Sequence, residues 1–133
     1  VQAQGFTFTY HNHAQELALI DGEHALDLLY AATDPALVQA ELDTFWIAKG
    51  GAEVVPYIRK HAGRAPEIHA KDMDAETGSF TEVGNGVLDW PAIFAAAREG
   101  GAEWVIVEQD ACPGNSLDSA RMSIENLKRM GLA

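Results

Sequence analysis

The sequence has 133 residues and 47% apolar content, which suits one domain with a buried core and implies no second domain. The formal net charge is −11 and no basic run is present, so nucleic acid and anionic membrane surfaces are poor partners. No apolar run is long enough to cross a bilayer, and a lone cysteine fits a reducing, cytoplasmic location.

Short segments rich in valine, isoleucine, phenylalanine and threonine alternate along the chain with longer segments of helical periodicity. This order predicts repeated βα units around a parallel sheet. In the last helix, Leu117, Ala120, Ile124 and Leu127 recur at three- and four-residue steps, which predicts one buried stripe. In chain order we expect a strand at 5–12, a helix at 23–32, a strand at 38–44, a helix at 52–61, a strand at 66–71, a helix at 90–99, a strand at 104–109 and a helix at 117–130.

The first three predicted strands have one apolar and one polar, ionisable face, because successive side chains point to opposite faces. In the first strand Phe8 and Tyr10 share one face, and Thr9 and His11 share the other. A sheet covered by helices on both faces would be apolar on both, whereas a closed β/α barrel gathers functional side chains on its inner face. The pattern therefore favours a barrel.

Imidazole and carboxylate groups stand at the carboxyl ends of all four predicted strands, where a barrel would bring them together. Such a mixed nitrogen and oxygen set suits Mn²⁺, Co²⁺ or Zn²⁺ more than Ca²⁺ or a thiolate-bound metal. Each residue also has an ordinary structural interpretation, such as a turn cap or a polar network. The candidates are His11 or His13, Asp43, His69 and Glu108.

Three other residues have simpler expectations. His24 and His61 lie within predicted helices, away from the strand ends, and we expect both at the surface. Trp46 follows Asp43 closely enough to line a pocket beside it.

Several longer strings are distinctive: YHNHAQEL, ELDTFWIAKGGAE, YIRKHAGRAPEIHAKDM, FTEVGNGVLDWPAIF and VIVEQD. Together they resemble the sugar phosphate isomerase/epimerase family, the xylose isomerase-like TIM barrels, over about residues 5–132. The resemblance implies an α/β fold of the (β/α)8 TIM-barrel type. A full barrel takes about 250 residues. We therefore expect residues 1–133 to form a single domain of about four βα units, strands 5–8, corresponding to the C-terminal half of a longer polypeptide.

The resemblance also implies one metal ligand at the end of each of these strands. Asp43, His69 and Glu108 match the family's motifs, while His11, with His13 next, stands where many relatives have a glutamate. Glu16 matches a second glutamate that contacts substrate in some relatives. Related epimerases often have a histidine at the position of Trp46, and these differences weigh against two-base epimerisation at C3. The implied cofactor is a divalent metal, with Mn²⁺ first and Zn²⁺, Co²⁺ or Mg²⁺ as alternatives.

The expected activity is metal-dependent isomerisation or epimerisation of a keto sugar, polyol or sugar phosphate through an enediolate. Glu108 would be the base, Lys71 would neutralise the oxyanion or bind phosphate, and His13 or Glu16 would be the opposing acid. The alternatives are a keto-sugar or inosose dehydratase and a non-catalytic half-barrel. A nuclease on the same barrel is disfavoured by the negative charge. Because a half-barrel exposes two strand edges, we also expect a homodimer.

Overall fold

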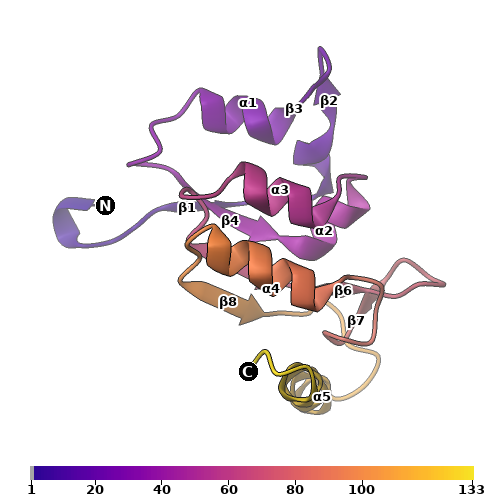
Figure 1. Cartoon of the computed structure of the whole chain (residues 1–133). Helices are drawn as coiled ribbons and strands as arrows, with labels where there is room; N and C mark the ends of the chain where they lie inside the picture. The colour runs from indigo at the N-terminus through magenta and orange to yellow at the C-terminus, as the bar shows by residue number, and fades with distance from the viewer. Residues whose placement is uncertain (1) are drawn as a thin grey trace.

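The computed structural model describes residues 2–133, and its centre is a parallel sheet of four strands in the order β1-β4-β5-β8 (Figure 1). Each neighbouring pair in this sheet is parallel. The architecture is that of a partial (β/α) barrel of about four units. The strands are β1 (Thr9–His11), β4 (Gln39–Asp43), β5 (Glu67–Ala70) and β8 (Trp104–Val107).

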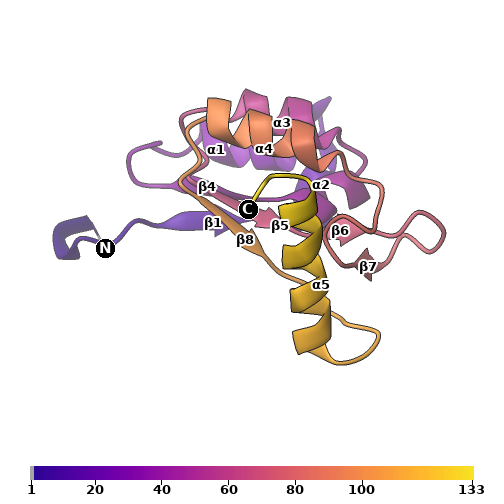
Figure 2. The ribbon, with the colours of Figure 1, turned by 60° about the horizontal axis from the view of Figure 1, so that its bottom comes forward.

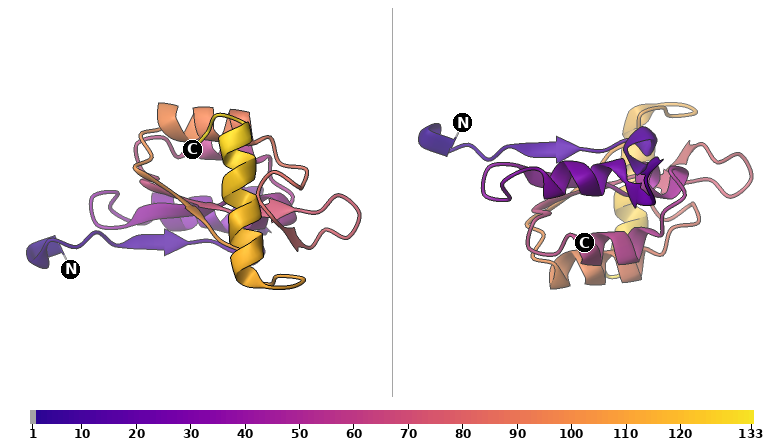
Figure 3. Two further views of the ribbon diagram at one scale, coloured as in Figure 1. Left: turned by 90° about the horizontal axis from the view of Figure 1, so that it is seen from below. Right: turned by 90° about the horizontal axis from the view of Figure 1, so that it is seen from above.

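Three helices form a layer over one face of the sheet (Figure 2). They are α1 (Ala25–Ala31), α3 (Val54–Lys60) and α4 (Trp90–Glu99). The core lies between this layer and the sheet, where Leu42 and Ile68 of the strands are fully buried in one cluster with Ile93 of α4. A fourth helix, α5 (Ser116–Arg129), follows β8 and lies outside the layer (Figure 3). No helix within residues 2–133 is long and apolar enough to span a membrane.

The predicted strands and helices all occur in the structure. The strands and the first two helices have shorter bounds, the helix at 90–99 has the predicted bounds, and the last helix is shifted by one residue toward the N-terminus. Several small elements were not predicted. The helix expected at 23–32 begins only at Ala25, because the two residues before it pair in a hairpin. A six-residue helix is too short to show periodicity, which is why α2 was missed. The additional elements are η1 (Gln2–Gln4), η2 (Ala14–Leu17), β2 (Leu19–Ile20), β3 (Glu23–His24), α2 (Thr44–Lys49), β6 (Asp72–Met73) and β7 (Phe80–Thr81).

The predicted buried stripe of α5 is correct for Leu127 and wrong for Leu117, Ala120 and Ile124, which are all exposed. The helix instead docks through hydrogen bonds, among them those from Ser119 Oγ to Glu82 Oε1 and from Asn126 Nδ2 to the Val83 carbonyl, both at 2.7 Å. Because the docking face is mostly polar, its residues show no apolar periodicity. The apolar pattern in the sequence therefore predicted burial for the wrong side of the helix. The buried residues of α5 are Ser119, Ser123, Asn126 and Leu127.

Asp72, in the string IHAKDM, forms hydrogen bonds with several residues of the string GNGVLDW. Its carboxylate is fully buried and accepts hydrogen bonds from the backbone amides of Gly84, Gly86 and Leu88, at 2.9, 3.1 and 3.2 Å. It also accepts one from Trp90 Nε1 at 2.7 Å. A side chain on Gly86 would place Cβ in overlap with Asp72 Oδ1, so only glycine allows this close approach. Asp72 thus fixes the loop that leads into α4.

His61 lies in the core, contrary to the surface position expected from its place in a helix, and only 8% of it is exposed. Its Nε2 lies 3.0 Å from Asp27 Oδ1 of α1, which also accepts a hydrogen bond from the Tyr57 hydroxyl at 3.0 Å. Burial lowers the pKa of His61 and outweighs the opposing effect of Asp27. His24 is half-buried, with Nδ1 2.6 Å from the carbonyl of Leu17, so it is not a free surface residue either.

Candidate metal centre

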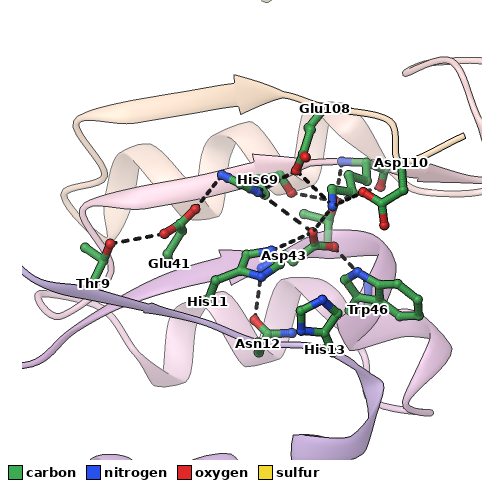
Figure 4. Close-up of polar contacts among 12 residues, drawn as sticks. Thr9, His11, Asn12, His13, Glu41, Asp43, Trp46, His69, Glu108 and Asp110 are labelled. Atoms are coloured by element: carbon green, nitrogen blue, oxygen red, sulfur yellow. Dashed lines mark hydrogen bonds and ion pairs between the residues drawn. The ribbon is translucent and has the colours of Figure 1, made fainter.

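Three of the predicted ligands meet on the inner face of the sheet, opposite the helix layer. Asp43 at the end of β4 is in register with His69 of β5, and His11 ends β1. One ligand atom from each lies within 4.8 Å of the others, in the only such group of histidine, cysteine and acidic residues among residues 2–133. Figure 4 shows the three side chains directed at one another from three adjacent strands.

Asp43 is fully buried, and its two carboxylate oxygens have different partners. Oδ1 accepts a hydrogen bond from the backbone amide of Trp46 at 3.0 Å and so caps α2. Oδ2 lies 3.0 Å from His11 Nε2 and 4.0 Å from His69 Nδ1. The hydrogen bond to Asp43 raises the pKa of His11 even though burial of the ring opposes the shift. The cap therefore orients the carboxylate so that its other oxygen faces both imidazoles.

Thr44 connects the strings LDTF and IHAKD. Its buried hydroxyl lies 2.8 Å from the carbonyl oxygen of Lys71 and 3.1 Å from that of His69, and it accepts a hydrogen bond from the Lys71 amide at 3.0 Å. These bonds tie the start of α2 to the end of β5. They hold Asp43 and His69 in register with each other.

Lys71 is buried beside the three-residue group and is surrounded by carboxylates. Its Nζ lies 2.6 Å from Asp110 Oδ1, 2.8 Å from Glu108 Oε2 and 3.1 Å from Asp43 Oδ2. Burial alone would lower the pKa of Lys71, but the hydrogen bonds to Asp110 and Glu108 raise it above its ordinary value. The hydrogen bond from Lys71 in turn lowers the pKa of Glu108. Lys71 and Glu108 are therefore both charged at neutral pH.

The remaining predicted residues lie around this group. Glu108 is close, with Oε2 2.9 Å from His69 Nδ1, and its side chain is 45% exposed. His13 is exposed, and its ring centroid is 4.9 Å from that of His11. Glu16 accepts hydrogen bonds from the His13 amide at 2.7 Å and from the Tyr10 hydroxyl at 3.3 Å. Metal binding by His13 and catalysis by Glu16 stay predictions.

Asp110 was not among the predicted site residues, although it provides the shortest contact to Lys71. The string VIVEQD contained the signal, because Asp110 follows Glu108 by two residues. In an extended backbone such residues point to the same side.

The three candidate ligand residues fit a divalent cation. Metal–ligand bonds of about 2.1 Å place two ligand atoms about 3 Å apart at a right angle and about 4.2 Å apart on opposite sides. The separations of 3.0 and 4.0 Å around Asp43 Oδ2 lie in this range. In addition, His69 Nδ1 is buried and has no hydrogen-bond partner, which is costly for a polar atom. A cation shared with His11 and Asp43 would satisfy it.

An apolar pocket of about 490 Å³ adjoins the candidate metal centre. Trp46, as predicted, is among its lining residues, together with Phe45 and Phe80, whose rings stack at 4.0 Å. The Phe80 ring centroid lies 6.0 Å from Lys71 Nζ, so the pocket begins beside the charged groups. Apolar walls next to a few polar groups are typical of small-molecule sites.

The parallel strands, the helix layer and the ligand cluster at the strand ends define a partial β/α barrel with a candidate metal centre. A family model described as xylose isomerase-like TIM barrel matches residues 1–130. The chain belongs to this family.

Two inosose dehydratases are similar to most of the chain. The one from Clostridium beijerinckii is 28% identical over an alignment of 145 positions, gaps included, that covers 94% of this chain and 48% of that protein. The one from Geobacillus thermodenitrificans is 28% identical over 83% of this chain and 42% of that protein. The chain thus spans about half the length of these relatives.

Two crystal structures of sugar phosphate isomerase/epimerases from Parabacteroides distasonis have a similar fold. The first has a TM-score of 0.81 at 24% identity and covers 96% of this chain and 46% of that chain. The second has a TM-score of 0.74 at 26% identity and covers 99% of this chain and 48% of that chain.

Proposed function

We propose that this chain carries the metal-binding half of a sugar-processing enzyme that isomerises or epimerises a keto sugar or polyol through an enediolate. The observation that carries the proposal is the convergence of the half-buried His11 and His69 on the buried Asp43, with His69 Nδ1 lacking a hydrogen-bond partner. Mn²⁺ is the first candidate cofactor, because imidazole and carboxylate ligands together suit it, as they suit Zn²⁺ and Co²⁺.

A divalent cation, when bound, supplies positive charge that polarises a ketone carbonyl. Glu108 would accept the proton from the neighbouring C–H; its lowered pKa, its partial exposure and its contact with His69 support this role. The Lys71 ammonium adds positive charge where the oxyanion of the enediolate develops. The apolar pocket beside Lys71 would take the part of the substrate that does not react.

A dehydratase of the same family is the second candidate, and the names of the relatives favour it. Isomerisation, epimerisation and dehydration share proton removal next to a carbonyl and differ in the fate of the enediolate. The enediolate is reprotonated at the other carbon, reprotonated on the other face, or loses a β-hydroxyl group as water. NMR of the products from keto sugars and inososes in D₂O distinguishes these fates.

The metal dependence is tested by elemental analysis after loading with Mn²⁺. We expect Asp43→Ala and His69→Ala each to lower the metal content, while Asp118→Ala, which removes an exposed carboxylate of α5, leaves it unchanged. Unchanged occupancy in both site variants would remove these residues from the ligand set. Bound metal without turnover on the substrate panel would favour a non-catalytic metal-binding module.

We further propose that the chain forms a homodimer. In the described part of the chain β1 and β8 each have one neighbour in the sheet, so both edges are open. Trp104 and Ile106, on the inner face of β8, are 63% and 40% exposed, and Leu117 of α5 is 71% exposed. Apolar side chains gathered at an open edge favour association with another copy. A monomer in light scattering would contradict this proposal.

A further inference from the structure

The two ring nitrogens of His69 face different surroundings. Nδ1 is buried, has no hydrogen-bond partner, and points toward Asp43 Oδ2 at 4.0 Å and Glu108 Oε2 at 2.9 Å. Nε2 lies 2.5 Å from Glu41 Oε1 on the other side of the ring. Figure 4 shows Glu41 between His69 and Thr9, away from the candidate metal centre.

A neutral imidazole carries its single proton on one of these nitrogens and a lone pair on the other. With the proton on Nδ1, the Nε2 lone pair would face a carboxylate oxygen at 2.5 Å, which is repulsive. With the proton on Nε2, that contact becomes favourable and the Nδ1 lone pair faces His11 and Asp43. Nδ1 also faces Glu108 Oε2 at 2.9 Å, but that carboxylate is already paired with Lys71 at 2.8 Å, whereas Glu41 contacts no lysine or arginine among the described residues. The position of Glu41 therefore selects the second arrangement.

Glu41 is itself held from the side opposite His69. Thr9 Oγ1 donates to Glu41 Oε2 at 3.1 Å, which leaves Oε1 for the imidazole. The same hydroxyl lies 3.1 Å from Glu67 Oε2, and its one hydrogen serves only one carboxylate at a time. Glu41 and Glu67 are neighbours in the register of β4 and β5, but only Glu41 contacts the ring of His69 in the described structure.

We propose that Glu41 is a positioning residue that keeps the His69 proton on Nε2 and thereby leaves Nδ1 as the nitrogen that binds the divalent cation. This inference rests on the proposed metal centre. Partners of this kind orient a histidine ligand and fix its tautomer. His11 differs, because its Nε2 faces the Asp43 carboxylate and must give up any proton there before it binds a cation. In contrast, the Nδ1 lone pair of His69 is available to a cation without the loss of a proton.

The tautomer is measured first, on the metal-free chain labelled with ¹⁵N in histidine, by long-range ¹H–¹⁵N NMR at pH 7.5. The His69 signals are identified by their absence in His69→Gln. We expect the neutral form of the ring to carry its proton on Nε2. A ring protonated on Nδ1, or on both nitrogens, would overturn the proposal.

Metal affinity is measured next by calorimetric titration with Mn²⁺ alone. Loss of such a partner typically lowers metal affinity roughly 10- to 100-fold, and we expect this in Glu41→Ala. Glu67→Ala is the matched control, because it removes an equal charge from the adjacent strand without touching His69, and its affinity should change little. Glu41→Gln, whose amide oxygen can still accept the Nε2 proton, should lose less and serves if Glu41→Ala does not fold.

The outcomes separate this inference from the proposed function. Equal losses in Glu41→Ala and Glu67→Ala would show a general charge effect and refute the positioning role. A wild-type chain that binds no Mn²⁺ would overturn the metal centre, while the NMR tautomer still decides whether Glu41 sets the protonation of His69.

Discussion

Replacing Asp72 by asparagine should destabilise the chain strongly, although the two side chains have nearly the same shape. Asp72 Oδ2 accepts three hydrogen bonds, from the Gly84 amide, the Gly86 amide and Trp90 Nε1. Oδ1 accepts two, from the amides of residues 73 and 88. Asparagine has one acceptor oxygen, and its NH₂ group would face the donors of the other set.

At least two buried donors would therefore lose their partner. Each unsatisfied buried donor costs about 1–3 kcal/mol, and some relaxation of the loop offsets part of the loss. We expect Asp72→Asn to lower the free energy of unfolding by about 2–5 kcal/mol. For a chain of this size the corresponding fall in Tm is roughly 10 °C or more.

Urea unfolding followed by tryptophan fluorescence measures this loss, because Trp90 is buried against Asp72 and becomes exposed on unfolding. Asp118→Asn is the control, since Asp118 is exposed and pairs only with Arg121 on the surface of α5. The control should change stability by about 0.5 kcal/mol or less. Equal effects of the two substitutions would refute the role assigned to Asp72.

Two further predictions concern the same fold. Gly86→Ala should cost about 1–3 kcal/mol, because its Cβ would overlap Asp72, whereas Gly114→Ala, with no atom within 4 Å of its Cβ, should be neutral in thermal unfolding; similar melting temperatures would contradict this. The lowered pKa of His61 means that the unfolded chain binds more protons below about pH 6.5, so stability falls as pH drops through this range. His61→Asn should lose less stability than the wild type between pH 7.5 and 5.5 in urea titrations, and parallel curves would show that the buried imidazole is not responsible.

The alternation of side chains along a strand is a backbone property, and it correctly predicted that His11, Asp43 and His69 share one face of the sheet. The same alternation predicts that Glu41 and Asp110 point to this face of the sheet. Their roles, however, depend on contacts with side chains from other strands. Sequence spacing gives the face on which a residue lies and not its partner.

The helix predictions failed where apolar periodicity was a poor guide to burial. The buried face of α5 is mostly polar, with Ser119 bonded to Glu82, and of the predicted apolar stripe only Leu127 lies on it. The sequence predicts a surface position for His61 because it lies in a predicted helix, away from the strand ends. Its burial depends on Asp27, which lies on another helix and is distant in the sequence.

The central claim is that one divalent cation binds between His11, Asp43 and His69. The most direct measurement is anomalous diffraction at the manganese edge from a crystal grown with Mn²⁺. The predicted result is one strong peak within about 2.0–2.3 Å of a ligand atom of each of the three residues. A map with no peak among them, or with its manganese peaks elsewhere, would contradict the account.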